Sequence, residues 1–105
     1  MNARSNLGAP KILCVESDTA VRESRCAVLE ISGYDTAAAA PHVAEVVLRS
    51  KKFDLIVISS LNDRDLHMIV NLSDGADVLV LDELVMPSEL LSLVARRLNG
   101  QRRRA

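Results

Sequence analysis

One short apolar run limits what this chain can fold into. Residues 53–60 read Phe-Asp-Leu-Ile-Val-Ile-Ser-Ser, four consecutive aliphatic residues entered by an aspartate and left by two serines. A run of this length, rich in Ile and Val, is typical of a strand buried on both faces at the centre of a parallel sheet. In such sheets, ligands bind outside the carboxyl ends of the strands. We therefore expect function to depend on the residues that leave this strand, beginning with Ser59.

The rest of the chain alternates between apolar strands and amphipathic helices. We predict strands over 11–15, 34–38, 53–58 and 76–81, and helices over 19–32, 41–52, 63–72 and 87–98. Asp18 is placed to cap the first helix and Gly33 to end it, while Asn99-Gly100 is expected to end the last. The residues expected to face inward from the helices are Val21, Val28, Leu29, Ile31, Val43, Val46, Val47, Leu66, Ile69, Val70, Leu90, Leu91, Val94 and Leu98. Four strand-helix repeats predict an α/β fold, a parallel sheet with helices on both faces.

Composition excludes several classes of function. Aromatic residues make up only 2% of the 105 residues, which argues against binding of single-stranded nucleic acid through base stacking. The formal net charge of −1 gives no positive surface for binding DNA. No apolar run approaches the roughly 20 residues of a membrane span, and the N-terminus lacks a secretory signal, so we expect a cytoplasmic protein. Cys14 and Cys26 are interpreted as small core residues of a reducing compartment. We expect a loose tail over 1–9, one domain over 10–99 and a basic tail over 100–105.

Several blocks, taken together, resemble the receiver domain of bacterial two-component response regulators. They are Lys-Ile-Leu-Cys-Val-Glu-Ser-Asp at 11–18, Leu-Glu-Ile-Ser-Gly-Tyr at 29–34, Phe-Asp-Leu-Ile-Val-Ile at 53–58, Gly-Ala-Asp at 75–77 and Pro-Ser-Glu-Leu-Leu at 87–91. The resemblance implies a flavodoxin-like α/β fold in which an aspartate after the third strand accepts phosphate from a histidine kinase. The family has five strands, whereas the segment 61–75 can hold only one helix. We expect four strands and four helices, with either the fourth or the fifth strand of the family missing.

The positions that carry phosphorylation in that family are changed here. Ser59 stands at the phosphoacceptor position, and the acidic pair that holds Mg²⁺ appears as Glu16 and Ser17 followed by Asp18. The position of the phosphate-contacting lysine falls on Asp82 or Glu83, which inverts its charge. Acyl-phosphate formation needs a carboxylate nucleophile and a neutralising metal ion. We therefore expect no ordinary aspartyl phosphorylation, and at most weak Mg²⁺ binding by Glu16 and Asp18, for which a helix cap and a solvated acid are the simpler interpretation.

The leading interpretation is a phosphorylation-independent pseudo-receiver that acts as a protein–protein interaction module in bacterial signalling. The apolar Leu84, Val85 and Met86, with the flank of the last helix at Leu91, are the predicted homodimer or partner surface. We expect no enzyme, because no nucleophile–base pair is visible. One alternative is a phosphate- or Mg²⁺-responsive switch that uses Glu16, Asp18 and Ser59. Another is a small nucleic-acid-associated protein that binds through the arginines at 102–104.

Overall fold

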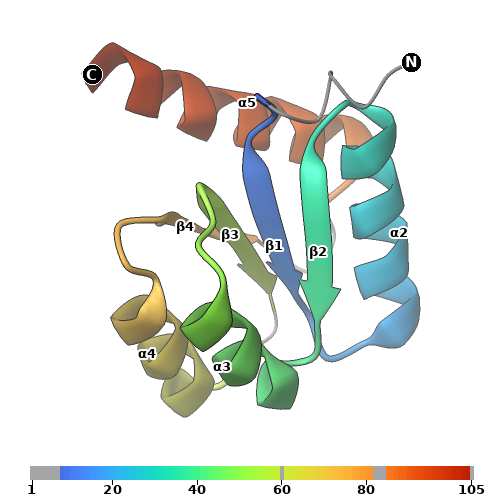
Figure 1. Cartoon of the computed structure of the whole chain (residues 1–105). Coiled ribbons are helices and arrows are strands. Elements are labelled where there is room, and N and C mark those ends of the chain that lie inside the picture. Colours follow the sequence, from blue (N-terminus) through green and yellow to red (C-terminus); the bar gives the residue numbers. More distant parts are fainter. Residues whose placement is uncertain (1–7, 60, 82–84, 105) are drawn as a thin grey trace.

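The chain folds into one parallel sheet with helices on both faces. The computed structural model describes residues 8–59, 61–81 and 85–104. The elements are β1 (Lys11–Val15), α2 (Thr19–Ile31), β2 (Asp35–Ala39), α3 (Pro41–Ser50), β3 (Leu55–Ser59), α4 (Asp63–Leu72), β4 (Asp77–Leu81) and α5 (Pro87–Arg104) (Figure 1). The strands are parallel in the order β2-β1-β3-β4. The predicted flavodoxin-like α/β fold with four strands and four helices is confirmed.

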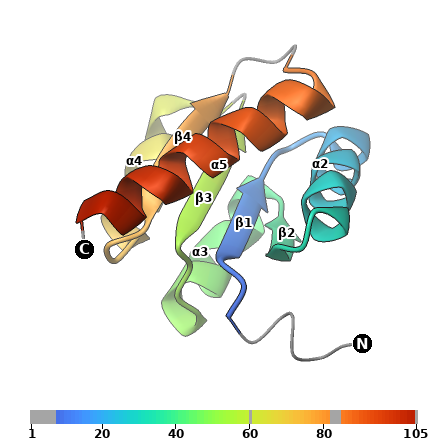
Figure 2. The ribbon, with the colours of Figure 1, turned by 90° about the horizontal axis from the view of Figure 1, so that it is seen from above.

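The two faces of the sheet bury two separate apolar clusters. Alternate side chains of each strand point to opposite faces, so one face packs against α2 and α5 and the other against α3 and α4 (Figures 1 and 2). The first cluster contains Ile12, Cys14, Leu29, Leu55, Val57, Leu79, Leu81, Leu90, Val94 and Leu98. The second contains Leu13, Val15, Ala39, Ala44, Leu48, Ile56, Ile58 and Ile69. All of these side chains are aliphatic or small, as the scarcity of aromatic residues requires.

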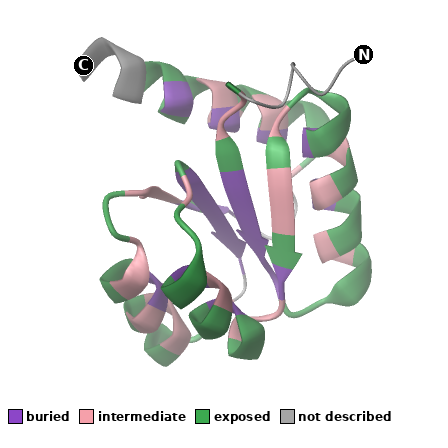
Figure 3. Cartoon of the chain, in the orientation of Figure 1, coloured by how far each residue is buried: buried purple, intermediate pink, exposed green. Residues whose placement is uncertain are grey.

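The central position of β3 brings Ser59 beside the end of β1. Every residue of β3 is buried, as its unbroken apolar sequence predicts (Figure 3). In the register of the sheet, Val15 is the partner of Ile58. The next residues along the two strands, Glu16 and Ser59, therefore leave the sheet side by side.

In the described part of the chain, the sheet has no strand beyond β4. The flavodoxin-like sheet has the order 2-1-3-4-5, and here β4 pairs directly with β3. The order of the described strands ends there, so the outermost position of that five-stranded order is unfilled. As a result β4 is an edge strand.

Some residues predicted to face inward are instead exposed. Ile31 is 87% exposed at the end of α2, and in α3 the buried residues are Ala44 and Leu48 rather than Val43 and Val46. The segment 43–48 is apolar at five of its six positions, so hydrophobicity alone does not fix which side of this helix faces the sheet. In α4, Ile69 is buried as predicted, whereas Val70 is 49% exposed.

The two cysteines differ in their surroundings. Cys14 is buried within β1, as predicted, whereas Cys26 is half-buried on α2 and its thiol donates to Glu30 Oε1 at 3.1 Å. Burial raises the pKa of the Cys14 thiol to about 12 and, together with the neighbouring Glu30 carboxylate, raises that of Cys26 to about 11. Both are therefore un-ionised thiols at neutral pH. Only Cys14 belongs to the core, so the prediction that Cys26 is also a core residue is wrong.

The last helix is longer than the sequence predicts. We expected Asn99-Gly100 to end it, yet α5 continues to Arg104. A glycine that ends a helix adopts a positive φ; Gly33 does so at 98°, whereas Gly100 is not among the positive-φ residues. A glycine inside a helix costs about 1 kcal/mol relative to alanine without forcing the helix to stop. Residues 100–104 are thus helical, and no helix in the described segments has the length and hydropathy needed to cross a membrane.

Candidate functional site

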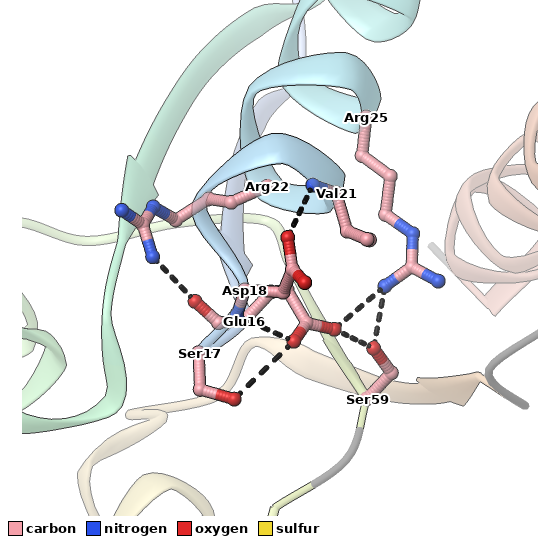
Figure 4. A network of polar contacts seen from close by, with 7 residues as sticks. All are labelled: Glu16, Ser17, Asp18, Val21, Arg22, Arg25 and Ser59. Carbon is pink, nitrogen blue, oxygen red and sulfur yellow. Dashed lines mark hydrogen bonds and ion pairs between the residues drawn. The ribbon is translucent and has the colours of Figure 1, made fainter.

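The candidate site lies at the carboxyl ends of the two central strands. Glu16 directly follows β1, Ser59 is the last residue of β3, and the first turns of α2 lie above them (Figure 4). Glu16 is 4% exposed and Ser59 is 2% exposed. A buried carboxylate is costly unless it is paired and hydrogen-bonded, so the partners of Glu16 decide what this site can do.

The Glu16 carboxylate is fully engaged by donors from its own chain. Its Oε1 accepts from Arg25 Nη1 at 3.3 Å and from the Ser59 hydroxyl. Its Oε2 accepts from the Asp18 backbone amide at 2.9 Å and from the Ser17 hydroxyl at 3.4 Å. Arg25 Nη1 also donates to Ser59 Oγ. Glu16, Arg25 and Ser59 therefore form a closed set of contacts, called the buried cluster below.

Arg25 belongs to this site although it is not among the site residues predicted from sequence. It lies in the second turn of α2, is 8% exposed, and points down to the strand ends (Figure 4). It is four positions after Val21 and four positions before Leu29, which places it within the apolar stripe of the helix. A charged residue inside such a stripe signals a buried partner, and this signal was present in the sequence.

Asp18 has a different task from Glu16. Its Oδ1 accepts from the Val21 backbone amide at 3.1 Å, so it is the predicted N-cap of α2, and its side chain is exposed. Arg22 adds a second tie, because its Nη1 donates to the Glu16 carbonyl oxygen at 2.7 Å. The two acids proposed as weak metal ligands are thus committed to separate structural contacts. Ser17 is exposed, and its contribution is the long hydrogen bond from its hydroxyl to Glu16 Oε2.

The hydrogen bonds determine the charge state of the site. Burial by itself would raise the pKa of the Glu16 carboxyl. The Asp18 amide, the Ser59 hydroxyl, the Arg25 charge and the Ser17 hydroxyl together outweigh burial and hold that pKa below its ordinary value. Glu16 is therefore ionised at neutral pH and forms a buried ion pair with Arg25.

The residues of this site do not fit the Mg²⁺ that receiver domains hold. Mg²⁺ requires several oxygen ligands in octahedral arrangement, whereas both oxygens of Glu16 already accept from internal donors, one of them a guanidinium. Within the described segments, no three His, Cys, Asp or Glu side chains gather closely enough to hold a metal ion. Asp82 and Glu83 lie outside the described residues.

Ser59 has a carboxylate beside it, contrary to our expectation that no base was near. Its hydroxyl donates to Glu16 and accepts from Arg25. With 2% of its surface exposed, however, this hydroxyl is not open to a substrate. The sequence placed Ser59 correctly at the strand end but did not reveal its partners.

A groove lies next to the buried cluster, between α2 and the start of α5. Its volume is about 310 Å³, and its lining consists of Ala20, Val21, Ser24, Arg25, Val28, Val85, Pro87 and Leu90. Of the predicted interaction residues, Val85 and Leu91 are half-buried against the core, Met86 is 61% exposed, and Leu84 lies outside the described residues.

Comparison with solved structures finds the same architecture in receiver domains. A receiver domain protein from Methanospirillum hungatei JF-1 superposes with a TM-score of 0.69 at 20% identity over 92% of this chain and 99% of its own. A receiver protein from Sinorhizobium medicae WSM419 gives 0.71 at 16% identity over 90% and 98%. The chain has the receiver fold. The receiver domain of a histidine kinase from Syntrophus aciditrophicus agrees, at 0.63 and 22% identity over 88% and 92%.

Sequence comparison adds no relative to this list. No protein-family model matches the chain, and no curated protein matches it. The receiver fold is thus supported by structure, and what the altered site does must be argued from its own residues.

Proposed function

We propose that this receiver-fold chain is a protein–protein interaction module in signal transduction and that it works without phosphorylation. The observation that carries the proposal is the Arg25 guanidinium, bonded to both Glu16 and Ser59 at the strand ends. The fold neighbours are receiver domains of response regulators and of a histidine kinase, which supports a place in signalling.

Internal pairing supports independence from phosphate. The positive charge that a metal ion would bring to the carboxylate is supplied here by Arg25, on the chain itself. An incoming phosphoryl group would have to separate Arg25 from Glu16 and reach a hydroxyl that is 2% exposed. Breaking a buried ion pair by removing one partner costs about 3–5 kcal/mol. We infer that the site has one stable arrangement and that its role is to fix α2 on the sheet.

The groove between α2 and α5 supports the interaction role. Its lining is apolar except for Ser24 and Arg25, and the charge of Arg25 is balanced by Glu16. A partner that inserts an aliphatic side chain would therefore meet no uncompensated charge. Val85 lines this groove and the exposed Met86 follows it in the chain, so two residues of the partner surface predicted from sequence lie in or next to the groove.

Independence from phosphate is tested by amide NMR, first with Mg²⁺ and then with beryllofluoride, a phosphoryl mimic. We expect no saturable shifts at Glu16, Asp18 or Ser59, while a receiver domain with an intact acidic site responds in the same buffers. Saturable shifts centred on these residues would instead make the chain a phosphate-responsive switch.

The groove is tested by a pair of matched substitutions on α2. Ala20→Glu places a charge in the groove, and Ala27→Glu places the same charge on an exposed part of the helix outside it. With the purified chain as bait, we expect a partner to be retained by wild type, Ala27→Glu and Ser59→Ala, and lost with Ala20→Glu. Retention by Ala20→Glu would remove the groove as the partner site, and loss with Ser59→Ala would contradict independence of the phosphoacceptor position.

A further inference from the structure

The edge strand β4 has its main-chain groups only partly satisfied. In a parallel pair, alternate residues direct both N–H and C=O toward the neighbouring strand. The Asp77 amide donates to the Asp54 carbonyl oxygen at 3.2 Å, so Asp77, and with it Leu79 and Leu81, face β3. Val78 and Val80 therefore direct their N–H and C=O groups to the free edge.

The first of these two residues is closed off by side chains. The Val78 amide donates to Asp77 Oδ1 at 3.0 Å, and its carbonyl oxygen accepts from Arg97 Nη1 at 3.3 Å. Arg97 Nη1 also holds both oxygens of Asp77, at 2.9 and 3.0 Å. Natural sheets protect exposed edges in this way, with charged side chains placed over the unpaired groups.

The second residue, Val80, remains open. Among the residues that the structure describes, no hydrogen bond reaches its outward N–H or C=O. Val80 is 61% exposed, and Val70 of α4 is 49% exposed. Both valines line a groove of about 480 Å³ together with Leu66, His67, Asn71 and Val78.

We propose that two copies of this chain associate through β4, in antiparallel pairing about a two-fold axis at Val80. A residue with both groups facing outward forms the hydrogen-bonded pair of an antiparallel ladder with another such residue. On a two-fold axis Val80 meets Val80 of the second copy, so one donor and one acceptor on each copy satisfy each other. This is the self-complementarity that a two-fold dimer requires.

The surroundings of Val80 favour a second copy as the occupant. The lining of the groove beside the edge contains no Asp, Glu, Lys or Arg. Two identical copies of this surface can therefore meet without bringing such like charges together. The other edge of the sheet, β2, has the sequence Asp-Thr-Ala-Ala-Ala, whose small side chains give little to pack against. The closed Val78 limits pairing to the region of Val80, which predicts a weak dimer rather than an open-ended filament.

Self-association is measured by sedimentation equilibrium on the full chain, up to about 1 mM, a range that detects weak complexes. We expect the mass to rise from 11.4 kDa toward twice that value. Val80→Lys places like charges opposite each other on the axis, and Val80→Pro removes the outward donor without touching the bonds to β3. Each should weaken the dimer at least tenfold, while Val46→Lys on the exposed face of α3, where Val46 is 67% exposed, should leave it unchanged.

Circular dichroism confirms that each variant is folded before it is compared. A wild-type mass that stays at 11.4 kDa over the whole range would overturn the inference, as would a Val80→Lys chain that dimerises like wild type. Either result leaves the proposed function intact, because the buried cluster and the groove between α2 and α5 do not involve β4. Conversely, a Mg²⁺ or beryllofluoride response would end phosphate independence without affecting the dimer.

Discussion

Replacing Arg25 by methionine tests whether the buried ion pair has the importance that its geometry indicates. Methionine has a similar length and a good helix propensity, so α2 itself should be little affected. The change leaves the Glu16 carboxylate, 4% exposed, without its cation. Removing one partner of a buried pair costs about 3–5 kcal/mol. Because Glu16 keeps the Asp18 amide and the Ser59 hydroxyl as donors, we expect the lower end, about 3 kcal/mol.

The pH dependence of this loss identifies its cause. In wild type the pKa of Glu16 is below its ordinary value of 4.5, so its stabilising contribution is present above pH 4.5 and is lost as the pH falls through the lowered folded pKa. In the Arg25→Met chain the Arg25 charge no longer counteracts the effect of burial, so we expect the pKa of Glu16 in the folded state to rise. Acidification then protonates Glu16 in the variant and removes its unpaired buried charge, which reduces the loss of stability. The difference in stability between the two chains should therefore be largest at neutral pH and shrink toward pH 4.

Urea unfolding followed by far-UV circular dichroism measures both effects. Two further variants isolate the ion pair. Glu16→Gln combined with Arg25→Met removes both charges and should recover part of the lost stability, because no unpaired charge is then buried. Arg22→Met, on the same helix, removes a hydrogen bond to a carbonyl oxygen and should cost only about 1 kcal/mol, with little pH dependence. A loss below 1 kcal/mol for Arg25→Met, or one that is equal at neutral and acid pH, would refute this account of the buried cluster.

Three further substitutions probe the local structure around the site. Asp18→Ala removes the side-chain cap of α2 and should cost about 1 kcal/mol in urea unfolding; no change would mean that the cap is not formed. Gly33→Ala should cost about 1 kcal/mol through the backbone alone, because φ is 98° and an added Cβ meets nothing within 4 Å; a thermal melt equal to wild type would contradict this. Ser59→Asp places a second buried carboxylate against Glu16, so its melting temperature should be well below wild type at pH 7 and recover on acidification; a stable chain at pH 7 would show that the site can accommodate both charges.

The fold could be predicted from the sequence because its signals are local and repeated. An apolar run of strand length, as at 55–58, has one stable environment in a small α/β protein, namely the centre of the sheet. The alternation of such runs with helical stretches then sets the topology. The exact faces of α3 and the end of α5 were missed because the local pattern was ambiguous there. Five apolar residues among six at 43–48 leave the helix phase open, and a glycine at position 100 is compatible with both an end and a continuation.

The site was only half predictable, for a different reason. Glu16, Asp18 and Ser59 were found because they follow strands, and position along the chain is enough to place them at the same sheet edge. Their partners depend on where a side chain from α2 reaches in space, which the strand pattern does not encode. Arg25 had one local signal, its place within an apolar stripe, but identifying Glu16 as its partner required the packing of α2 on the sheet.

The spacing between the helix cap and the arginine restricts how this segment can change during evolution. Asp18 fixes where α2 begins, and Arg25 follows it by about two turns, which returns it to the same side of the helix. Inserting or deleting one residue between them would rotate Arg25 by roughly 100° and leave the Glu16 carboxylate without its cation. Length changes should therefore be excluded from this stretch even where the residue types vary. Chains in which an arginine neutralises the carboxylate in this way should carry the same signature, Glu-x-Asp followed by Arg seven positions after the Asp, with Ser at the end of the third strand.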